Sequence, residues 1–130
     1  MAAPTVATYS AAALVAANTS FKDLIDAGAG AGSIKIRDAA DVLLAQIPLT
    51  DPCGTVNGAT GQLTITPSGR DESADATGTA AYGEFCDSAG LVHLSLPAQA
   101  GSAAVIGKIV INSLSIVAGG PVEALSATVG

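Results

Sequence analysis

Aromatic side chains are scarce in this sequence. Its 130 residues include two Phe, two Tyr and no Trp, whereas hydrophobic residues of all kinds make up 49% of the chain. Alanine, valine, leucine and isoleucine must therefore fill the core. Aromatic rings provide most stacking surfaces for small ligands and many of the anchors of protein interfaces. Their scarcity argues against a platform that binds nucleobases or sugars by stacking.

Basic residues are also few, and long apolar runs are absent. The chain has five Lys and Arg against eleven Asp and Glu, with a formal net charge of −6. The basic residues are scattered, at Lys22, Lys35, Arg37, Arg70 and Lys108. Nucleic-acid binding needs clustered basic residues, and a membrane-spanning helix needs about 18 consecutive apolar residues. We therefore expect neither nucleic acid nor a membrane as a direct partner.

Two cysteines, Cys53 and Cys86, and one histidine, His93, are the only thiol and imidazole ligands that the sequence offers to zinc. This set cannot form a closed structural zinc site without added carboxylates. A disulfide between the two cysteines stays open as an alternative. Free buried thiols are favoured, because the reducing cytosol is the compartment we expect.

Cys86 and His93 raise the question of a small hydrolase. They lie seven positions apart across a short turn and could meet on one sheet. Nucleophilic catalysis also needs an orienting acid, and no nucleophile elbow or glycine-rich oxyanion segment surrounds Cys86. In the segment 91–96 the histidine alternates with Val92 and Leu94, which places it on the solvated face. We expect a surface histidine, no enzymatic activity and no cofactor.

The segment 70–85, RDESADATGTAAYGEF, begins with a cluster of charge. Asp71, Glu72 and Asp75 could bind a hard cation such as calcium, which takes oxygen ligands. Their spacing does not match the alternating ligands of a calcium-binding loop. A solvated acidic loop that leads into a strand is therefore favoured over a metal site.

The chain length predicts one domain. Residues 1–8 contain Pro4 and threonines without an apolar period, so we expect an extended N-terminal arm there and a single domain over 9–130. The domain begins with a helix over 10–27, for which Ser10 is the expected N-cap. Asn18, Thr19 and Ser20 weaken the middle of this helix and could interrupt it.

After the helix, the pattern changes to strands. Alternating or continuous apolar segments are separated by Gly, Pro, Asn and Asp turns. The expected strands are 33–37, 41–49 (closed by Pro48), 61–67, 76–86, 91–96, 108–117 and 121–129. The sequence predicts a mainly β fold: an antiparallel β-sandwich or jelly-roll-like barrel of about seven strands with one N-terminal helix.

Three segments of the chain carry a family resemblance. They are ESADATGTAAYGEF (72–85), INSLSIVAGGPVEALSATV (111–129), and the block that contains LLAQIPLTDPCG and GQLTIT (43–66). Together they resemble a family of small β-rich virion proteins of tailed bacteriophages, and among these the capsid cement or decoration proteins most. The resemblance covers about residues 32 to 130, and no catalytic residue comes with it.

The resemblance implies a structural role on the outside of the virion capsid, after synthesis in the cytoplasm of the host bacterium. The implied partner is the phage major capsid protein, whose neighbouring subunits the chain would clamp as a homo-oligomer, a dimer or trimer. A tail, head–tail connector or fibre-associated protein is the alternative.

The expected partner-binding residues lie in and just after the arm, at Pro4, Thr5, Val6 and Tyr9. The apolar helix could also dock on a neighbour. We expect it to cover its own sandwich instead, because a sheet pair otherwise leaves a face uncovered.

Overall fold

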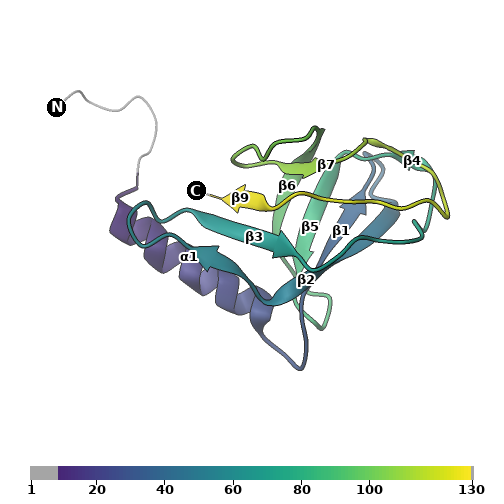
Figure 1. Cartoon of the computed structure of the whole chain (residues 1–130). Helices are drawn as coiled ribbons and strands as arrows, with labels where there is room; N and C mark the ends of the chain where they lie inside the picture. Colours follow the sequence, from purple (N-terminus) through teal and green to yellow (C-terminus); the bar gives the residue numbers. More distant parts are fainter. Residues whose placement is uncertain (1–8, 130) are drawn as a thin grey trace.

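The computed structural model describes residues 9–129, so the predicted arm at 1–8, with Pro4, Thr5 and Val6, lies outside the described residues. One helix precedes nine strands (Figure 1). The elements are α1 Ala11–Asp26, β1 Ser33–Arg37, β2 Leu43–Val56, β3 Leu63–Pro67, β4 Gly78–Thr79, β5 Tyr82–Cys86, β6 Val92–Ala100, β7 Ile109–Ile111, β8 Ser115–Ile116 and β9 Ala127–Val129.

Seven strands form one sheet in the order β7-β6-β5-β1-β2-β3-β9, and β4 pairs with β8 in a separate small sheet. All neighbouring strands are antiparallel except β6 and β7, which are parallel. The two ends of the large sheet meet, because single bridges join Ile106 to Thr128 and Ile111 to Ala124. The sheet is nearly closed, and the predicted mainly β, barrel-like fold with one N-terminal helix is confirmed.

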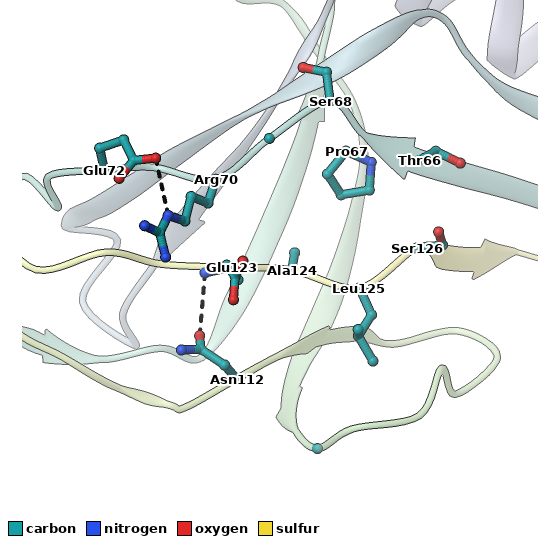
Figure 2. Close-up of a pocket in the computed structure, with 12 residues that line it drawn as sticks. Thr66, Pro67, Ser68, Arg70, Glu72, Asn112, Glu123, Ala124, Leu125 and Ser126 are labelled. Carbon is teal, nitrogen blue, oxygen red and sulfur yellow. Dashed lines mark hydrogen bonds and ion pairs between the residues drawn. The ribbon is translucent and has the colours of Figure 1, made fainter.

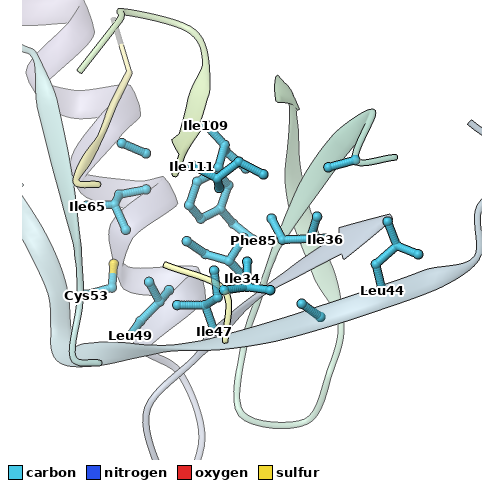
Figure 3. Packing of buried hydrophobic residues seen from close by; sticks show 14 of the residues in the cluster. Ile34, Ile36, Leu44, Ile47, Leu49, Cys53, Ile65, Phe85, Ile109 and Ile111 are labelled. Carbon is cyan, nitrogen blue, oxygen red and sulfur yellow. The ribbon is translucent and has the colours of Figure 1, made fainter. Parts of the chain in front are cut away.

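The core is aliphatic around a single buried aromatic ring. Figure 3 shows Phe85 surrounded by isoleucines and leucines from several strands, and its side chain has no exposed surface. Strand β1 alternates as predicted, with Ile34 and Ile36 fully buried and the basic residues between and after them half-buried. Leu63 and Ile65 of β3 also point inward, as their alternation predicts.

Helix α1 is continuous, and its middle is fixed by contacts with distant segments. The Ser10 side chain accepts a hydrogen bond from the Ala13 N–H (3.1 Å), which confirms the predicted N-cap. Asn18 is buried, and its Nδ2 donates to the backbone oxygens of Gly61 (2.6 Å) and Val129 (3.4 Å). The predicted helix is confirmed, and the interruption that these residues could cause does not occur. The Asn18 side chain bonds to the turn before β3 and to the end of β9 instead of to its own helix backbone.

The C-terminal half of α1 covers an edge of β2. In its second half, β2 has left β1 and pairs with β3, so one side of its backbone lacks a strand partner. There the Cys53 N–H donates to Oδ1 of Asp26 at the end of α1 (2.7 Å). The helix therefore covers its own barrel, as expected, and satisfies a backbone group that no strand reaches.

Strand β2 is longer than predicted, because Pro48 does not end it. Its first half pairs with β1 as far as Pro48, and its pairing with β3 begins at Leu49. A proline lacks the N–H that a ladder needs. Pro48 is tolerated because it lies where β2 changes its partner strand from β1 to β3. The pairing of β2 with β3 begins only at the next residue.

The long strand predicted over 76–86 is divided into β4 and β5. Between them, the Ala80 N–H donates to Leu114 O (2.8 Å), and the next N–H, of Ala81, donates to Arg37 O (2.9 Å). The chain thus leaves the small sheet and enters the large one within two residues. The segments predicted at 108–117 and 121–129 contain only the short strands β7, β8 and β9.

Candidate functional site

A hollow in the described part of the chain lies beside the charged start of the segment 70–85 (Figure 2). Its volume is about 620 Å³. Two stretches form its walls, the end of β3 with the loop after it and the segment before β9. The lining residues are Thr66, Pro67, Ser68, Gly69, Arg70, Glu72, Gly101, Asn112, Glu123, Ala124, Leu125 and Ser126.

The polar groups of this hollow bond mainly to one another. Arg70 Nε donates to Glu72 Oε1 (3.0 Å), and this bond raises the pKa of the guanidinium. On the opposite wall, Asn112 Oδ1 accepts the Glu123 N–H (3.3 Å). The lining contains hydroxyls and two carboxylates, from Glu72 and Glu123, and it contains no histidine, cysteine or lysine. It is a polar depression that can receive polar groups of a partner.

The acidic residues after Arg70 have separate structural roles. Asp71 accepts backbone hydrogen bonds on both oxygens, from Gln46 N–H (2.9 Å) and Ser73 N–H (3.0 Å), and so ties the loop to β2. Glu72 pairs with Arg70, and Asp75 is exposed. Within residues 9–129, no three His, Cys, Asp or Glu side chains are placed so that they could hold a metal ion.

The sequence predicts that His93 lies on the solvated face, and this prediction is wrong. Its Nε2 lies 3.1 Å from Oδ2 of Asp87, and each of the two side chains is only 13% exposed. The other oxygen of Asp87 accepts the backbone N–H groups of Ala89 and Leu91 (both 3.0 Å), which closes the β5–β6 turn. The bond to His93 is the main cause of a lowered pKa of the Asp87 carboxyl, and the backbone bonds add to it. The histidine thus stabilises a hairpin.

The two thiols are free and buried, as favoured from the sequence. Burial raises the pKa of Cys86, and burial together with the nearby Asp26 carboxylate raises the pKa of Cys53 to about 12. Thiolates are the reactive form of cysteine. Neither thiol is therefore suited to nucleophilic attack at neutral pH, and His93 bonds to Asp87 instead of to Cys86.

A polar cluster on the outside of the sheet was not predicted. Arg37 forms an ion pair with Glu84 and donates to Asp41 O (3.0 Å), while Tyr82 Oη donates to Asp41 Oδ1 (2.6 Å). That last bond is the main cause that raises the pKa of Tyr82 to about 12. The cluster ties the β1–β2 turn to β5. Strand register brings these residues together, and no sequence pattern reveals register.

Of the expected partner-binding residues, only Tyr9 is described, and it is 70% exposed just before α1. The other large apolar side chains that remain exposed are Leu24, Val42, Leu91, Val92, Ile106, Val117 and Leu125. They come from several elements, so single apolar contacts are spread over the surface. Single apolar side chains scattered in this way are ordinary on protein surfaces and do not by themselves mark a binding site.

Searches with this chain against protein-family models, curated proteins and solved structures find no match. Within the described residues, α1 is the only helix, and it is too short and too weakly apolar to cross a membrane.

Proposed function

We propose that this chain is a structural virion protein of a tailed bacteriophage, and that it decorates the capsid by binding neighbouring subunits of the major capsid protein. The observation that carries the proposal is the resemblance of residues 32–130 to small β-rich virion proteins. The segment 72–85 contains β4 and most of β5, and the segment 111–129 contains β8, β9 and the end of β7. A bridge within the second segment, from Ile111 to Ala124, helps to close the large sheet.

The arrangement of reactive side chains supports a role without catalysis. His93 and Asp87 hold a turn, Asp71 holds a loop, and both thiols are buried. A decoration protein needs no active site, and it occupies many equivalent positions on a symmetric shell. Modest contacts then suffice, because each additional attachment of an oligomer gains from a high effective concentration.

The proposed contacts with the capsid begin at the N-terminal arm. Pro4, Thr5 and Val6 precede Tyr9 in the sequence, and Tyr9 is mostly exposed and can join an interface. On this proposal the protein is a dimer or trimer on the outer surface of the virion. It would be made in the host cytoplasm and would contact neither nucleic acid nor membrane directly.

The number of copies per particle tests the proposal. Quantitative mass spectrometry of purified virions and of tail-less heads from the same phage should give a copy number matched to the major capsid protein in both samples. A few copies in whole virions and none in tail-less heads would instead favour the alternative, a tail, connector or fibre component. Absence from both samples would overturn the phage assignment.

Binding to empty shells tests the arm. The full chain should bind shells of the major capsid protein until all sites are filled, and a variant that lacks residues 2–8 should bind less. A variant with the same seven residues in scrambled order is the matched control for length and composition. Equal binding by all three proteins would exclude the arm as a contact.

A further inference from the structure

The turn that joins β2 to β3 contains an asparagine followed by a glycine, Asn57 and Gly58. Both residues are exposed, and no atom lies within 4 Å of the position that a Cβ of Gly58 would take. Among the described residues, the Gly58 N–H has no hydrogen-bond partner. Water and base therefore have free access to the peptide unit between the two residues.

The side chain of Asn57 is folded forward along this turn. Its Oδ1 accepts the backbone N–H groups of Ala59 (2.8 Å) and Thr60 (3.1 Å), and its own N–H donates to Gln62 O (2.8 Å). Oδ1 thus reaches past Gly58 to the next two residues. The carboxamide is held alongside the Gly58 peptide unit, and its rotation is restricted by two hydrogen bonds.

We propose that Asn57 is a site of spontaneous covalent modification in the native turn, with the Gly58 backbone nitrogen as the nucleophile and water as the only other reactant. In the first step a bond forms between Gly58 N and Asn57 Cγ, and the bond between Cγ and Nδ2 breaks. The amide nitrogen leaves as ammonia and takes up the proton that Gly58 N loses. The product is a five-membered cyclic imide.

Water then opens the imide at one of its two carbonyl groups. Cleavage of the new bond between Cγ and Gly58 N gives aspartate at position 57. Cleavage of the original peptide bond leaves the main chain running through Cβ and Cγ, which is an isoaspartyl linkage. Either product adds one negative charge to a chain whose formal net charge is −6.

Three features of the turn favour the first step. The nucleophile and the carbonyl carbon belong to adjacent residues in a fixed arrangement, so little entropy is lost when they meet. Negative charge develops on Oδ1 during the attack, and the N–H groups of Ala59 and Thr60 already point at this atom. Gly58 has no Cβ that could hinder the approach of the carboxamide.

The other two asparagines of the sequence lack this combination. Asn18 is buried, its Nδ2 donates to two backbone oxygens, and Thr19 follows it. Oδ1 of Asn112 accepts one N–H, from Glu123 (3.3 Å), and the next residue is Ser113. Both following residues have a Cβ. We therefore expect the reaction at Asn57 alone.

The modification would reach helix α1, because the same turn supports it. Gly61 O accepts the Nδ2 of Asn18 (2.6 Å), and a Cβ at Gly61 would lie 2.3 Å from the Leu14 Cβ. Figure 1 shows the turn beside the N-terminal end of the helix. Aspartate at position 57 keeps an acceptor for both N–H groups of the turn, whereas an isoaspartyl linkage lengthens the main chain by one methylene. We expect only the isoaspartyl form to loosen the N-terminal half of α1. This inference does not rest on the proposed capsid role.

Mass spectrometry of the native chain during incubation tests the reaction. At about pH 8, where base assists the loss of the amide proton, residue 57 should gain about 1 Da and appear as both aspartate and isoaspartate. Asn18 and Asn112 should stay unmodified until more than half of Asn57 has reacted. Gly58→Ala is the matched control, because its Cβ fits without contact and its φ is not in the left-handed region. This variant should stay folded and react at least about tenfold more slowly.

The contribution of the turn is tested by unfolding. The native chain should react at least as fast as the same chain in urea at the same pH. A slower reaction in the native chain would show that the turn protects Asn57 and would overturn the proposal. Aspartate without isoaspartate would indicate direct hydrolysis by water and would overturn the role of Gly58 N. Equal rates for Gly58→Ala and the unmodified chain, or equal modification of Asn112, would also overturn it.

Hydrogen exchange tests the effect on α1. The isoaspartyl form, separated from the aged protein, should exchange the amide hydrogens of the first half of α1 faster than the unmodified chain. Asn57→Asp adds the same charge without lengthening the main chain, and it should exchange like the unmodified chain. Equal exchange in all three proteins would overturn the proposed link between this turn and the helix.

Discussion

Gly54 in β2 leaves no room for a side chain beside β3, and this gives a sharp test of the sheet register. An ideal Cβ at this position would lie 2.0 Å from the Thr64 oxygen and 2.9 Å from the Ile65 Cα. Both atoms belong to the backbone of β3, which pairs with β2 at these residues. No side-chain rotation can make room, so Gly54→Ala must push the two strands apart.

The cost follows from the atoms that must move. Overpacking relieved by side chains costs about 1–3 kcal/mol, and here the backbone must shift, which also weakens one or two ladder hydrogen bonds at about 1 kcal/mol each. We expect Gly54→Ala to lower the free energy of unfolding by about 3–5 kcal/mol. For a domain of this size, that corresponds to a fall in melting temperature of roughly 10–20 °C.

Gly58→Ala is the matched control for this experiment. It makes the same chemical change four residues later, where no atom lies within 4 Å of the added Cβ. The control should leave stability unchanged or raise it by up to about 1 kcal/mol, since alanine restricts the unfolded chain. Urea unfolding at 25 °C and thermal melts, both followed by circular dichroism, give the two values. If Gly54→Ala unfolds within about 0.5 kcal/mol of the control, the described register of β2 and β3 is wrong.

Three further predictions concern buried polar and titratable groups. Asn18→Ala should lower the free energy of unfolding by about 1–3 kcal/mol in urea titrations, because two backbone oxygens lose their donor. As the control, Thr19→Ala at an exposed position should change the free energy of unfolding by less than about 0.5 kcal/mol. Equal effects of the two substitutions would contradict the role of Asn18. The pKa of Asp87 is lowered in the folded state, so the stabilisation that this carboxylate provides is present above its ordinary pKa and is lost as the pH falls through the lowered one. Asp87→Asn should therefore be destabilising near pH 6, and its difference from the unmodified chain should shrink as the pH falls below about 4, the ordinary pKa of an Asp carboxyl. A difference that does not change with pH would refute this. In the native protein at about pH 8, a thiol reagent should leave Cys53 and Cys86 unmodified until urea unfolds the chain, and fast labelling of either thiol would contradict their burial.

Local signals in the sequence were sufficient for several elements. The Ser10 cap depends on residues within one turn, and the alternation in 33–37 and 61–67 reports directly which side chains face the core. The short turn expected between the strands 76–86 and 91–96 is equally local, because the Asp87 carboxylate bonds to backbone groups two and four residues later. These features were predicted correctly because their causes lie within a few residues of one another.

Features that depend on distant segments were not predictable in the same way. Helix propensity alone suggests an interruption at Asn18, and only the carbonyl groups that arrive from Gly61 and Val129 show why the helix continues. The division of 76–86 has a similar cause, since Ala80 and Ala81 bond to segments that are far apart in the sequence. Alternation predicts extended chain correctly, but it does not tell which sheet each part joins.

The polar side chains show the same limit. The sequence places Asp71 in a solvated acidic loop, and the structure shows its carboxylate bonded to the Gln46 backbone of β2. Likewise, the isolated histidine has no motif around it, and its partner is visible only once the β5–β6 turn is formed. Charge clusters in a sequence mark candidates, but the partner that decides their role comes from the fold.

The way in which the sheet edges are covered limits how this protein can meet a partner. Helix α1 covers the second half of β2, and the segment before β9 bridges to β7, so these edges cannot accept an added strand. The edge of β6 that β7 leaves uncovered contains Pro97, which has no N–H to donate. Contacts must therefore be made mainly through side-chain faces, and those faces have few aromatic residues to provide strong anchors. On the proposed role in many copies, no single contact has to be strong, because neighbouring attachments add to one another.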